Sequence, residues 1–391
     1  MQITKIKLKN WRNFQRAETK KLADVCYILG PNASGKSNLL DAFRFLRDVG
    51  KPKGGGLQIA IEHRGGLGKL RCLHARNDTD VMLEVELGID TDTPEWRYTL
   101  AFNFPRSGKR IPIIKQEKVT AIKLDGTEEE ILNRPNDDDK IDTERLHETH
   151  LEQISANSKF RNLADFFGSI TYVHLVPQLL KFGDRIGGHV MEEDPFGQAF
   201  MERIAASTVK TRTARLKRIE KALQTIIPHL EDLQFIKDEI SGRPHLEIRY
   251  KHHRPHGAKQ REDQFSDGTL RLISILWLLQ EGGDSPLLLE EPELSLNEEI
   301  VANIPRIVDE VRRRMKNRRQ LFISTHSEAL LSNSAIDPVG ILVIVPSVEG
   351  STLRGADDDE LSAMESGFSP AEVVLPNARK VSEKAQIELA L

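Results

Sequence analysis

The chain has 391 residues, with 56 Lys and Arg against 59 Asp and Glu, and a net charge of -3. This length predicts two or three structural units, or one large domain with insertions. The near-neutral charge excludes a molecule coated with nucleic-acid-binding basic groups, so any contact with DNA must use local patches. Cys26 and Cys72 are too few for a disulfide framework or a cysteine-based zinc site.

Neither a signal peptide nor a membrane-spanning segment is expected. Residues 1–10 alternate basic and apolar side chains and lack a continuous apolar core. The longest strongly apolar run, residues 272–279, is far shorter than the ~20 residues that span a bilayer. We therefore expect a cytoplasmic protein that does not contact membranes.

The first part of the chain predicts strands followed by a loop and a helix. Residues 25–29 form a short apolar strand that runs into a glycine-containing loop, and apolar residues then follow at helical spacing from Leu39 to Leu46. Two alternating runs, residues 81–89 and 96–104, predict an antiparallel hairpin with one solvated face. The acidic residues 125–150 predict a solvated surface insertion.

The second part of the chain alternates strands and helices. Strands are predicted at residues 170–176, 246–250, 287–289, 321–324 and 341–345, and helices at 196–227, 269–279 and 297–316.

A phosphate-binding loop is the strongest motif. Residues 30–37, Gly-Pro-Asn-Ala-Ser-Gly-Lys-Ser, match GxxxxGK[ST] completely, with a strand before the loop and a helix after it. The glycines let backbone N–H groups turn toward phosphate oxygens, and the positive end of the helix faces them. We expect Lys36 to reach the β and γ phosphates of ATP and Ser37 to bind Mg²⁺.

Two carboxylates follow a predicted buried strand. Glu290 and Glu291 come directly after residues 287–289 and precede Pro292. If this strand lies beside the phosphate loop, Glu290 would reach the Mg²⁺ shell and Glu291 would polarise the attacking water. Glu replaces the usual Asp at the metal-binding position, which keeps the charge on a longer side chain. A charged turn without a catalytic role is the alternative interpretation.

Five segments, in order along the chain, resemble the ABC-type ATPase heads of the SMC, RecF and OLD group. They are residues 9–14, 30–42, 265–269, 290–293 and 324–327. More narrowly, the chain resembles small AAA-like, ABC-headed ATPases of bacterial defence gene pairs, and residues 367–376 are similar to the ending of that subgroup. The resemblance implies an α/β ABC-ATPase head, a P-loop NTPase fold with a mixed sheet, an antiparallel β side sheet and a helical insertion.

The resemblance also implies roles for individual residues. Nucleotide contacts are expected from Gly30, Asn32, Ser34, Gly35, Lys36, Ser37 and Asn38. Arg12 would lie near the nucleotide, His326 would sense or hold the γ phosphate, and Gln178 would sense Mg²⁺ and water. Ordinary structural or surface roles are the alternatives for these three residues. The catalytic set would be Glu291, Lys36 and His326, and the metal set Ser37, Glu290 and Gln178.

A second phosphate cradle is expected at Ser266 and Gly268, which resemble the ABC signature motif. The start of a helix offers a hydroxyl, backbone N–H groups and a positive end. Because the chain already has one cradle in its phosphate loop, the second is best used on the γ phosphate bound by a neighbouring copy. We therefore expect two heads to enclose two ATP molecules head-to-tail, in a homodimer or a higher oligomer.

Four segments are expected along the chain. They are an N-terminal ATPase lobe (1–177), a helical insertion (178–245), a C-terminal ATPase lobe (246–345) and a tail (346–391). The insertion is too short for the coiled-coil arms of the large family members. The tail is too short for the Toprim nuclease domain of the OLD enzymes.

The lack of an effector domain predicts an ATPase that gates a separately encoded effector, a nuclease or toxin, in anti-phage or plasmid defence. A RecF-like repair ATPase acting directly on double-stranded DNA is one alternative, and an ATP-binding scaffold with incidental hydrolysis is another. Three basic runs, residues 210–221, 251–261 and 312–319, would contact phosphates in the DNA alternative. Solvated protein surface is the other interpretation of each run.

Overall fold

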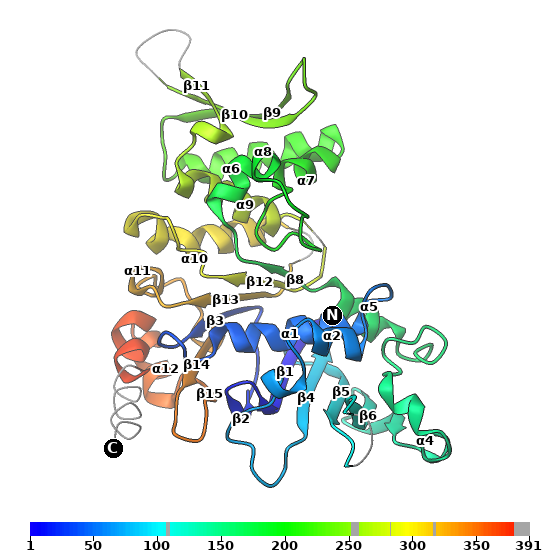
Figure 1. The fold of residues 1–391 in the computed structure, drawn as a ribbon. Coiled ribbons are helices and arrows are strands. Elements are labelled where there is room, and N and C mark those ends of the chain that lie inside the picture. Colours follow the sequence, from blue (N-terminus) through cyan, green and yellow to red (C-terminus); the bar gives the residue numbers. More distant parts are fainter. Residues whose placement is uncertain (107–109, 252–257, 282, 316–317, 379–391) are drawn as a thin grey trace. The chain divides into compact units, whose positions relative to one another are not determined.

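The computed structural model describes residues 1–106, 110–251, 258–281, 283–315 and 318–378 (Figure 1). They form two compact units, each with its own core. The first contains Met1–Ile170, Gln320–His326 and the described residues from Asp337 on, and the second contains Thr171–Arg319 and Ser327–Ile336. Residues 252–257 of the second basic run lie outside the described residues.

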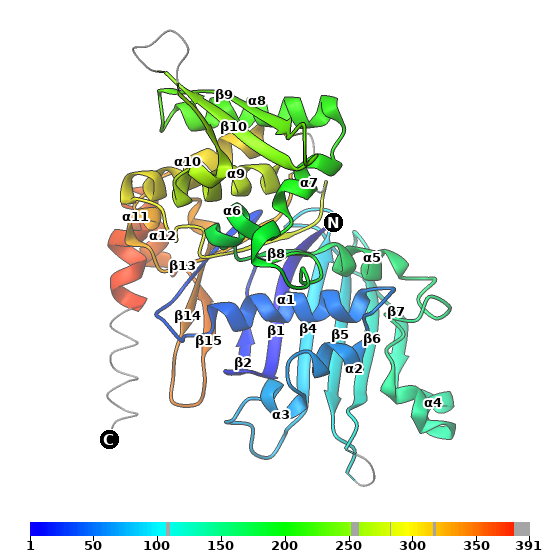
Figure 2. The same cartoon turned by 45° about the horizontal axis from the view of Figure 1, so that its top comes forward.

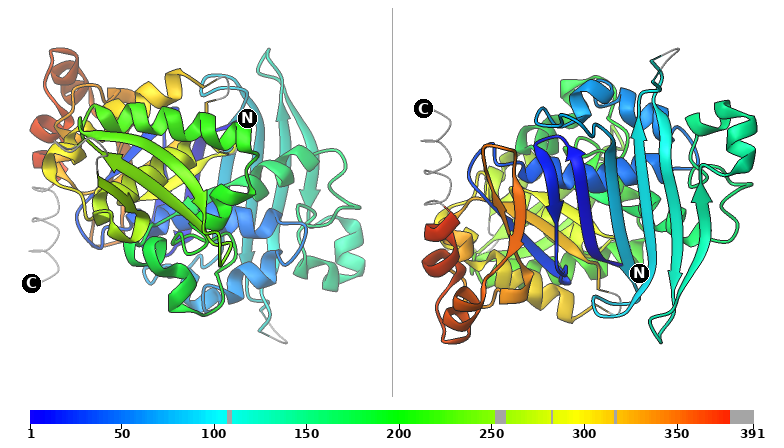
Figure 3. Two further views of the ribbon diagram at one scale, coloured as in Figure 1. Left: turned by 90° about the horizontal axis from the view of Figure 1, so that it is seen from above. Right: turned by 90° about the horizontal axis from the view of Figure 1, so that it is seen from below.

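A six-stranded antiparallel sheet of order β2-β1-β4-β5-β6-β7 occupies the first unit (Figure 3, right). Its strands are β1 (Gln2–Trp11), β2 (Phe14–Glu18), β4 (Val81–Gly88), β5 (Pro94–Asn103), β6 (Ile113–Ile122) and β7 (Glu128–Arg134). β4 and β5 form the predicted hairpin, and alternate residues of β4 from Val81 to Leu87 are buried. The antiparallel side sheet is confirmed.

The first unit also holds four strands in the order β15-β14-β3-β13. They are β3 (Val25–Leu29), β13 (Leu321–Thr325), β14 (Ile341–Val345) and β15 (Thr352–Gly355). β3 is parallel to both of its neighbours, whereas β15 is antiparallel to β14. β13 is buried along its whole length, as expected for a strand covered on both faces. The predicted mixed sheet is therefore confirmed.

Helix α1 (Lys36–Gly50) joins the two sheets of the first unit into one core. Phe45 packs against Trp11 and Phe102 of the antiparallel sheet, with ring centroids 5.2 and 5.3 Å away. Phe43 packs against Phe322 of β13 at 4.7 Å. Figure 2 shows α1 crossing one face of the antiparallel sheet. The other helices of this unit are α2 (Leu57–Glu62), α3 (Leu67–Leu70), α4 (Asp137–Ile141), η1 (Thr143–His147), α5 (Arg161–Ser169), η3 (Pro338–Gly340) and α12 (Asp358–Glu365).

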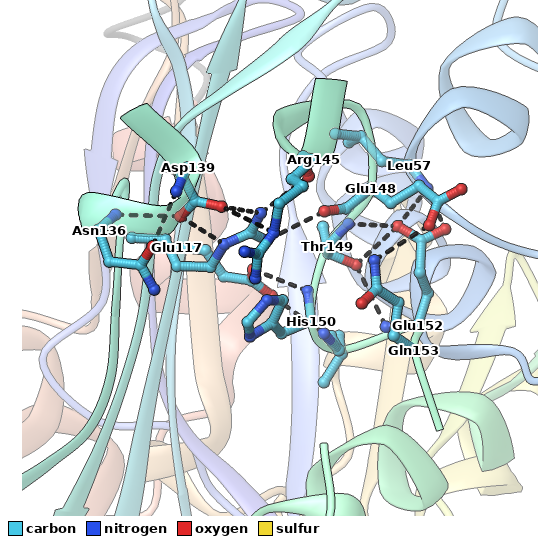
Figure 4. Close-up of polar contacts among 12 residues, drawn as sticks. Leu57, Glu117, Asn136, Asp139, Arg145, Glu148, Thr149, His150, Glu152 and Gln153 are labelled. Atoms are coloured by element: carbon cyan, nitrogen blue, oxygen red, sulfur yellow. Dashed lines mark hydrogen bonds and ion pairs between the residues drawn. The ribbon is translucent and has the colours of Figure 1, made fainter. Parts of the chain in front are cut away.

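The acidic segment 125–150 is not the purely solvated insertion that its composition predicts. Part of it is β7, the edge strand of the antiparallel sheet. At the end of β7, Arg134 forms ion pairs with Glu117 (2.9 Å) and Asp139 (2.8 Å), and all three side chains have 0% exposure. We call Glu117, Arg134 and Asp139 the buried ion cluster. Figure 4 labels Glu117 and Asp139 of this cluster among neighbouring residues. Most residues of the segment are exposed, as its composition predicts, and the prediction fails at Asp139, whose partner is an arginine buried with it.

The second unit combines a parallel strand pair, a three-stranded antiparallel sheet of order β11-β10-β9, and helices. The strands are β8 (Thr171–Val173), β9 (Leu230–Lys237), β10 (Pro244–Tyr250), β11 (Ala258–Arg261) and β12 (Leu287–Glu290). The helices are α6 (Pro177–Ile186), α7 (Phe200–Ala206), α8 (Val209–Gln224), η2 (Glu262–Gln264), α9 (Asp267–Leu279), α10 (Glu298–Arg313) and α11 (Glu328–Leu331).

Helix α9 is the core of the second unit. Residues 268–279 are all buried, and the helix contacts α6, α8 and α10. A helix that is apolar on all sides is stable only when other elements surround it. The predicted helix 196–227 is divided into α7 and α8, because the first helix ends at the extended residue Ser207 and Thr208 then caps the start of the second. Strand β9, within the segment predicted as a helical insertion, is a feature that the sequence did not predict.

Candidate functional site

The phosphate loop has the backbone geometry that its motif requires. Gly30 follows β3, and the loop returns to the start of α1 at Lys36. Gly35 has φ +110°, and a Cβ atom there would lie 2.3 Å from the Asn13 amide, so only glycine fits. No side chain of the described residues caps the start of α1. Its first backbone N–H groups are therefore suited to bind an anion.

Side chains of the loop also fit a polar ligand. Lys36 is 7% exposed and donates hydrogen bonds to the carbonyl oxygens of Gly30 (2.9 Å) and Pro31 (3.2 Å). The hydroxyl of Ser34 is buried and has no hydrogen-bond partner among the described residues. Such a group costs about 1–3 kcal/mol unless it finds a partner, which favours a ligand with oxygen acceptors. Asn32 and Ser37 are exposed, and Asn38 is half-buried.

Two side chains brace the loop from elsewhere in the first unit. Asn13 donates to the carbonyl oxygen of Ser34 (2.6 Å) and to the hydroxyl of Ser351 (2.8 Å), and it accepts from Asn38 (2.8 Å). Ser351 also donates to the Ser34 carbonyl (2.8 Å). Asn13 lies in residues 9–14, one of the segments that resemble the ABC-type heads, but the sequence alone assigned it no role. Ser351 had no sequence signal, because it reaches the loop from more than three hundred residues away.

Arg12 lies against the helix that follows the loop. Its backbone has φ 53°, and its guanidinium forms an ion pair with Asp41 of α1 (2.7 Å). Asp41 also pairs with Arg64 at 3.0 Å. Arg12 thus has a structural contact that ties β1 to α1, and its contact with a nucleotide stays a prediction.

His326 lies at the same edge of the sheet as the phosphate loop. β13 is parallel to β3, and Thr325 is in register with Leu29. His326 follows β13 and Gly30 follows β3, so the two residues leave the sheet at neighbouring positions. His326 is exposed, so its side chain is accessible at this edge. The role as a γ-phosphate sensor remains a prediction.

The acidic turn lies in the second unit and is supported by two residues that the sequence did not single out. Glu290 ends β12 and accepts a hydrogen bond from the hydroxyl of Tyr172 (2.5 Å) on the neighbouring strand β8. Glu291 has φ 44°, and its backbone oxygen accepts from Arg271 (2.8 Å) on α9. Arg271 is 2% exposed, and burial lowers the pKa of its guanidinium. Helix α9, which begins at the signature residues Ser266 and Gly268, thus holds the turn that carries Glu291.

The signature residues are packed against the same turn. A Cβ atom on Gly268 would lie 2.9 Å from the carbonyl oxygen of Ser295, which explains the glycine by close packing alone. Ser266 is exposed, and its hydroxyl accepts from the backbone N–H of Thr269 (3.0 Å). Ser266 therefore caps the thirteen-residue helix α9 from an exposed position, whereas Gly268 and the residues after it are buried.

Gln178 is brought to the signature helix. Its amide donates to the carboxylate of Asp267 (3.4 Å), the first residue of α9. Lys181, one helical turn further along α6, pairs with the same carboxylate at 2.6 Å. Gln178 is exposed, so the Mg²⁺ role expected from the resemblance stays a prediction.

The predicted site residues thus divide between the two units. Arg12, the loop 30–38 and His326 belong to the first unit, whereas Gln178, Ser266, Gly268, Glu290 and Glu291 belong to the second. Within the described ranges, His, Cys, Asp and Glu side chains do not gather in threes as a metal centre. This is compatible with Mg²⁺, which is often held by one or two carboxylates together with phosphates of the substrate.

Comparison with known proteins supports the assignment of residues 30–37 as a phosphate-binding loop. The sequence profile of the family described as "AAA domain, putative AbiEii toxin, Type IV TA system" matches residues 27–332. The chain belongs to this family. A profile described as "P-loop containing region of AAA domain" matches residues 3–46. Membership of this P-loop family implies nucleotide binding. In the described part of this family member, no helix combines the length and apolar character needed to cross a bilayer.

Two DNA replication and repair proteins RecF match shorter stretches. That of Roseiflexus castenholzii is 34% identical over 92 residues, which cover 22% of this chain and 23% of the relative. That of Chlamydia caviae is 48% identical over 46 residues, 12% of each chain. The matched stretches span less than a quarter of these relatives.

The solved structure of an SMC head bound to the C-winged helix domain of ScpA has a TM-score of 0.52 and 14% identity. The match covers 92% of this chain and 99% of that one. At this identity the likeness concerns the fold alone. Together with the family match, it confirms the predicted ABC-type ATPase head of the SMC and RecF group. The narrower placement among defence ATPases stays a prediction.

Proposed function

We propose that this chain binds ATP with Mg²⁺, hydrolyses it slowly, and pairs head-to-tail with a second copy when ATP is bound. The observation that carries the proposal is the complete phosphate loop at the uncapped start of α1, with a buried Ser34 hydroxyl that needs a partner. Backbone N–H groups at the start of α1 and the Lys36 ammonium would hold the phosphates. The family to which the chain belongs supports this assignment.

Each remaining site residue has a proposed task. Ser37, Glu290 and Gln178 would hold Mg²⁺, which supplies positive charge against the phosphate oxygens. Glu291 would orient and polarise a water molecule, and His326 would hold the γ-phosphate end of the nucleotide. Ser266, which is exposed, and Gly268 would contact the nucleotide of the second copy at the start of α9.

The proposed biological role is to gate a separately encoded nuclease or toxin in anti-phage or plasmid defence. The family description, which mentions a toxin and a Type IV TA system, favours this role. A RecF-like function acting directly on DNA is the second candidate, favoured by the matches to RecF proteins. An ATP-binding scaffold with incidental hydrolysis is the third. It would gain weight if Glu291→Gln retained full biological activity.

The test is the rate of ATP turnover with and without linear duplex DNA at low salt. Wild type should turn over ATP, Lys36→Ala should lose nucleotide binding or turnover, and Glu291→Gln should bind ATP without hydrolysing it. Normal turnover by Glu291→Gln would remove Glu291 as the water-polarising group. Strong stimulation by DNA would favour the RecF-like candidate, and no stimulation would favour a protein effector.

Dimerisation is tested separately with Ser266→Arg. A bulky cation at the start of α9 should block pairing in the presence of ATP while the monomer still binds nucleotide. Light scattering and a nucleotide-binding assay on the same sample measure the two properties. Loss of nucleotide binding by the isolated variant would contradict a role for Ser266 on the neighbouring copy.

A further inference from the structure

The structure separates the three basic runs, which looked equivalent in the sequence. In the run 312–319, Arg312 and Arg319 are buried, at 8% and 3% exposure. Arg313 and Arg314 form ion pairs with Asp309 (2.8 Å) and Glu310 (2.5 Å) on the same helix. Four of the described charges of this run are therefore buried or paired with neighbours, and Arg318 is a single exposed charge.

The described residues of the run 251–261 are also paired. Lys251 lies 3.2 Å from Glu231, Lys259 lies 2.8 Å from Glu247, and Arg261 lies 3.6 Å from Asp238. These ion pairs link the strands of the β11-β10-β9 sheet and their turns. They leave little uncompensated charge on the described part of this surface.

Helix α8, which carries the run 210–221, is different. Lys210, Lys217, Arg218 and Lys221 are exposed, and none of them forms an ion pair among the described residues. Arg218 donates a hydrogen bond to the carbonyl oxygen of Ala214 and lines a surface pocket together with Glu310. At 100° per residue, these four positions fall on one side of the helix, which we call the outer face of α8. The opposite side carries the buried residues Leu216, Ile219, Ala222 and Leu223.

The other basic residues of α8 serve the core instead. The Arg212 guanidinium lies 4.0 Å from the ring centre of Phe235 on β9, and that of Arg215 lies 5.2 Å from Trp277 on α9. Glu220, the one acid in the helix, accepts from the backbone of Leu233 on β9 and so is directed to the inner side. The left view of Figure 3 shows α8 (green) running beside the β11-β10-β9 sheet. The outer face therefore keeps four exposed positive charges that form no ion pair among the described residues.

The side chains of the outer face favour duplex DNA over two other anionic partners, a membrane surface and single-stranded nucleic acid. Lys210 and Lys221 are separated by about 16 Å along the helix axis, a length over which duplex DNA presents roughly ten phosphate charges. An interfacial membrane helix needs a free apolar face, whereas the apolar face of α8 is buried in its own unit. No aromatic residue occurs in α8, so stacking on single-stranded bases has no platform.

We propose that the outer face of α8 binds the phosphate backbone of double-stranded DNA, without reading base sequence. This deepens the second candidate function by naming the surface that contacts DNA. Lys and Arg heads on one helix face supply point contacts to phosphates, which position a duplex but do not specify its sequence. Binding should therefore depend strongly on salt and weakly on sequence.

The test measures binding of a short, fluorescently labelled duplex by anisotropy over a salt series. The variant carries Lys217→Gln, Arg218→Gln and Lys221→Gln together. Its affinity at low salt should fall at least about tenfold, and the slope of log K against log salt should become smaller by about 3, one for each lost contact. Circular dichroism confirms that the variant is folded.

Two matched controls remove the same number of positive charges elsewhere. One carries Lys20→Gln, Lys53→Gln and Lys159→Gln, which are exposed positions of the first unit. The other carries Lys251→Gln, Lys259→Gln and Arg261→Gln, the ion-paired positions. Both should keep most of the wild-type affinity and slope. Equal losses in either control and in the α8 variant would overturn the proposal, because binding would then follow net charge.

Further outcomes separate this inference from the proposed ATPase function. Wild type that hydrolyses ATP but binds no duplex overturns the inference, as does wild type that binds phosphatidylserine vesicles and not DNA. Duplex binding through α8 without ATP turnover supports the inference and contradicts the ATPase proposal. Basal turnover without DNA should be unchanged in the α8 variant.

Discussion

The buried ion cluster of the first unit and the outer face of α8 in the second use charge in opposite ways. Both arise from segments that are rich in charged residues. In the cluster, Glu117, Arg134 and Asp139 are fully buried and paired. On α8, Lys210, Lys217, Arg218 and Lys221 are exposed and form no ion pair with any residue that the structure describes. Charge density in a sequence therefore does not distinguish a structural cluster from a binding surface, whereas burial and pairing do.

The cluster is stable because its hydrogen bonds are complete. All five N–H groups of Arg134 donate: to Asp139, to Glu117, and to the carbonyl oxygens of Arg145 and Glu148. Glu117 also accepts from the backbone N–H groups of His150 and Leu151 (Figure 4). Since burying ions carries a large desolvation cost, a complete set of partners is required. The cluster thereby ties β6 and β7 to the segment that follows them.

The largest effect is expected from breaking the cluster. Arg134→Met leaves buried Glu117 without its cation and Asp139 with only the more distant Arg145 (3.7 Å), and it should lower the free energy of unfolding by about 3–5 kcal/mol. Urea denaturation monitored by circular dichroism measures the change. Arg145→Met is the comparison variant, because Arg145 is more exposed, lies 3.3 Å from Asp138, and reaches the cluster only through a longer contact with Asp139 (3.7 Å). A loss below about 1 kcal/mol for Arg134→Met would show that the cluster is not structural.

The next effect concerns pH. Burial lowers the pKa of His150 to about 4, from an ordinary value of 6.5, and the charge of Arg134 acts in the same direction. Arg145 also lowers this pKa, whereas Asp139 raises it. The unfolded chain therefore binds the proton first, so stability is lost as the pH falls from about 6.5 to about 4.

His150→Gln should remove this component of the pH dependence, on the order of 2 kcal/mol across the window. Unfolding free energies of wild type and variant, measured between these two pH values, give the difference. His147→Gln is the control, since His147 lies in the same segment. Parallel pH profiles for wild type and His150→Gln would contradict the assignment.

A smaller effect should separate the two sides of α8. Arg212→Ala removes the cation–π contact with Phe235 and the packing of the side-chain stem, and should cost about 1–2 kcal/mol. Arg218→Ala, on the outer face of the same helix, should change stability by less than about 0.5 kcal/mol. Thermal denaturation of both variants tests the contrast. Equal costs would mean that the outer face contributes to the fold.

The smallest effect has the opposite sign. Lys217 and Lys221 are one helical turn apart, and like charges at this spacing repel by a few tenths of a kcal/mol. Lys221→Gln should therefore leave stability unchanged or raise it slightly, most clearly at low salt. Denaturation at low and high salt checks this. A clear loss of stability would reveal a partner for Lys221 and weaken the distinction between the cluster and α8.

Local sequence determined much of the fold and part of the site. The phosphate loop, the strand before it and the helix after it are contiguous in the chain, so their geometry follows from residues 25–46. The alternating run beginning at Val81 likewise predicted its strand and its buried face, because strand periodicity is local. The start of α9 at Ser266 follows the same rule, since a cap is a contact over three residues.

Only the tertiary structure decided which distant groups support these local elements. Ser351 hydrogen-bonds the phosphate loop, Arg271 holds the backbone of Glu291, and Arg134 removes Asp139 from solvent. The sequence also could not show which of the three basic runs is exposed and unpaired, because it does not reveal whether a lysine lies beside an acid or beside water. Pairing and burial depend on chain segments that meet only after folding, and they separate the charges that hold this protein together from those left free on α8.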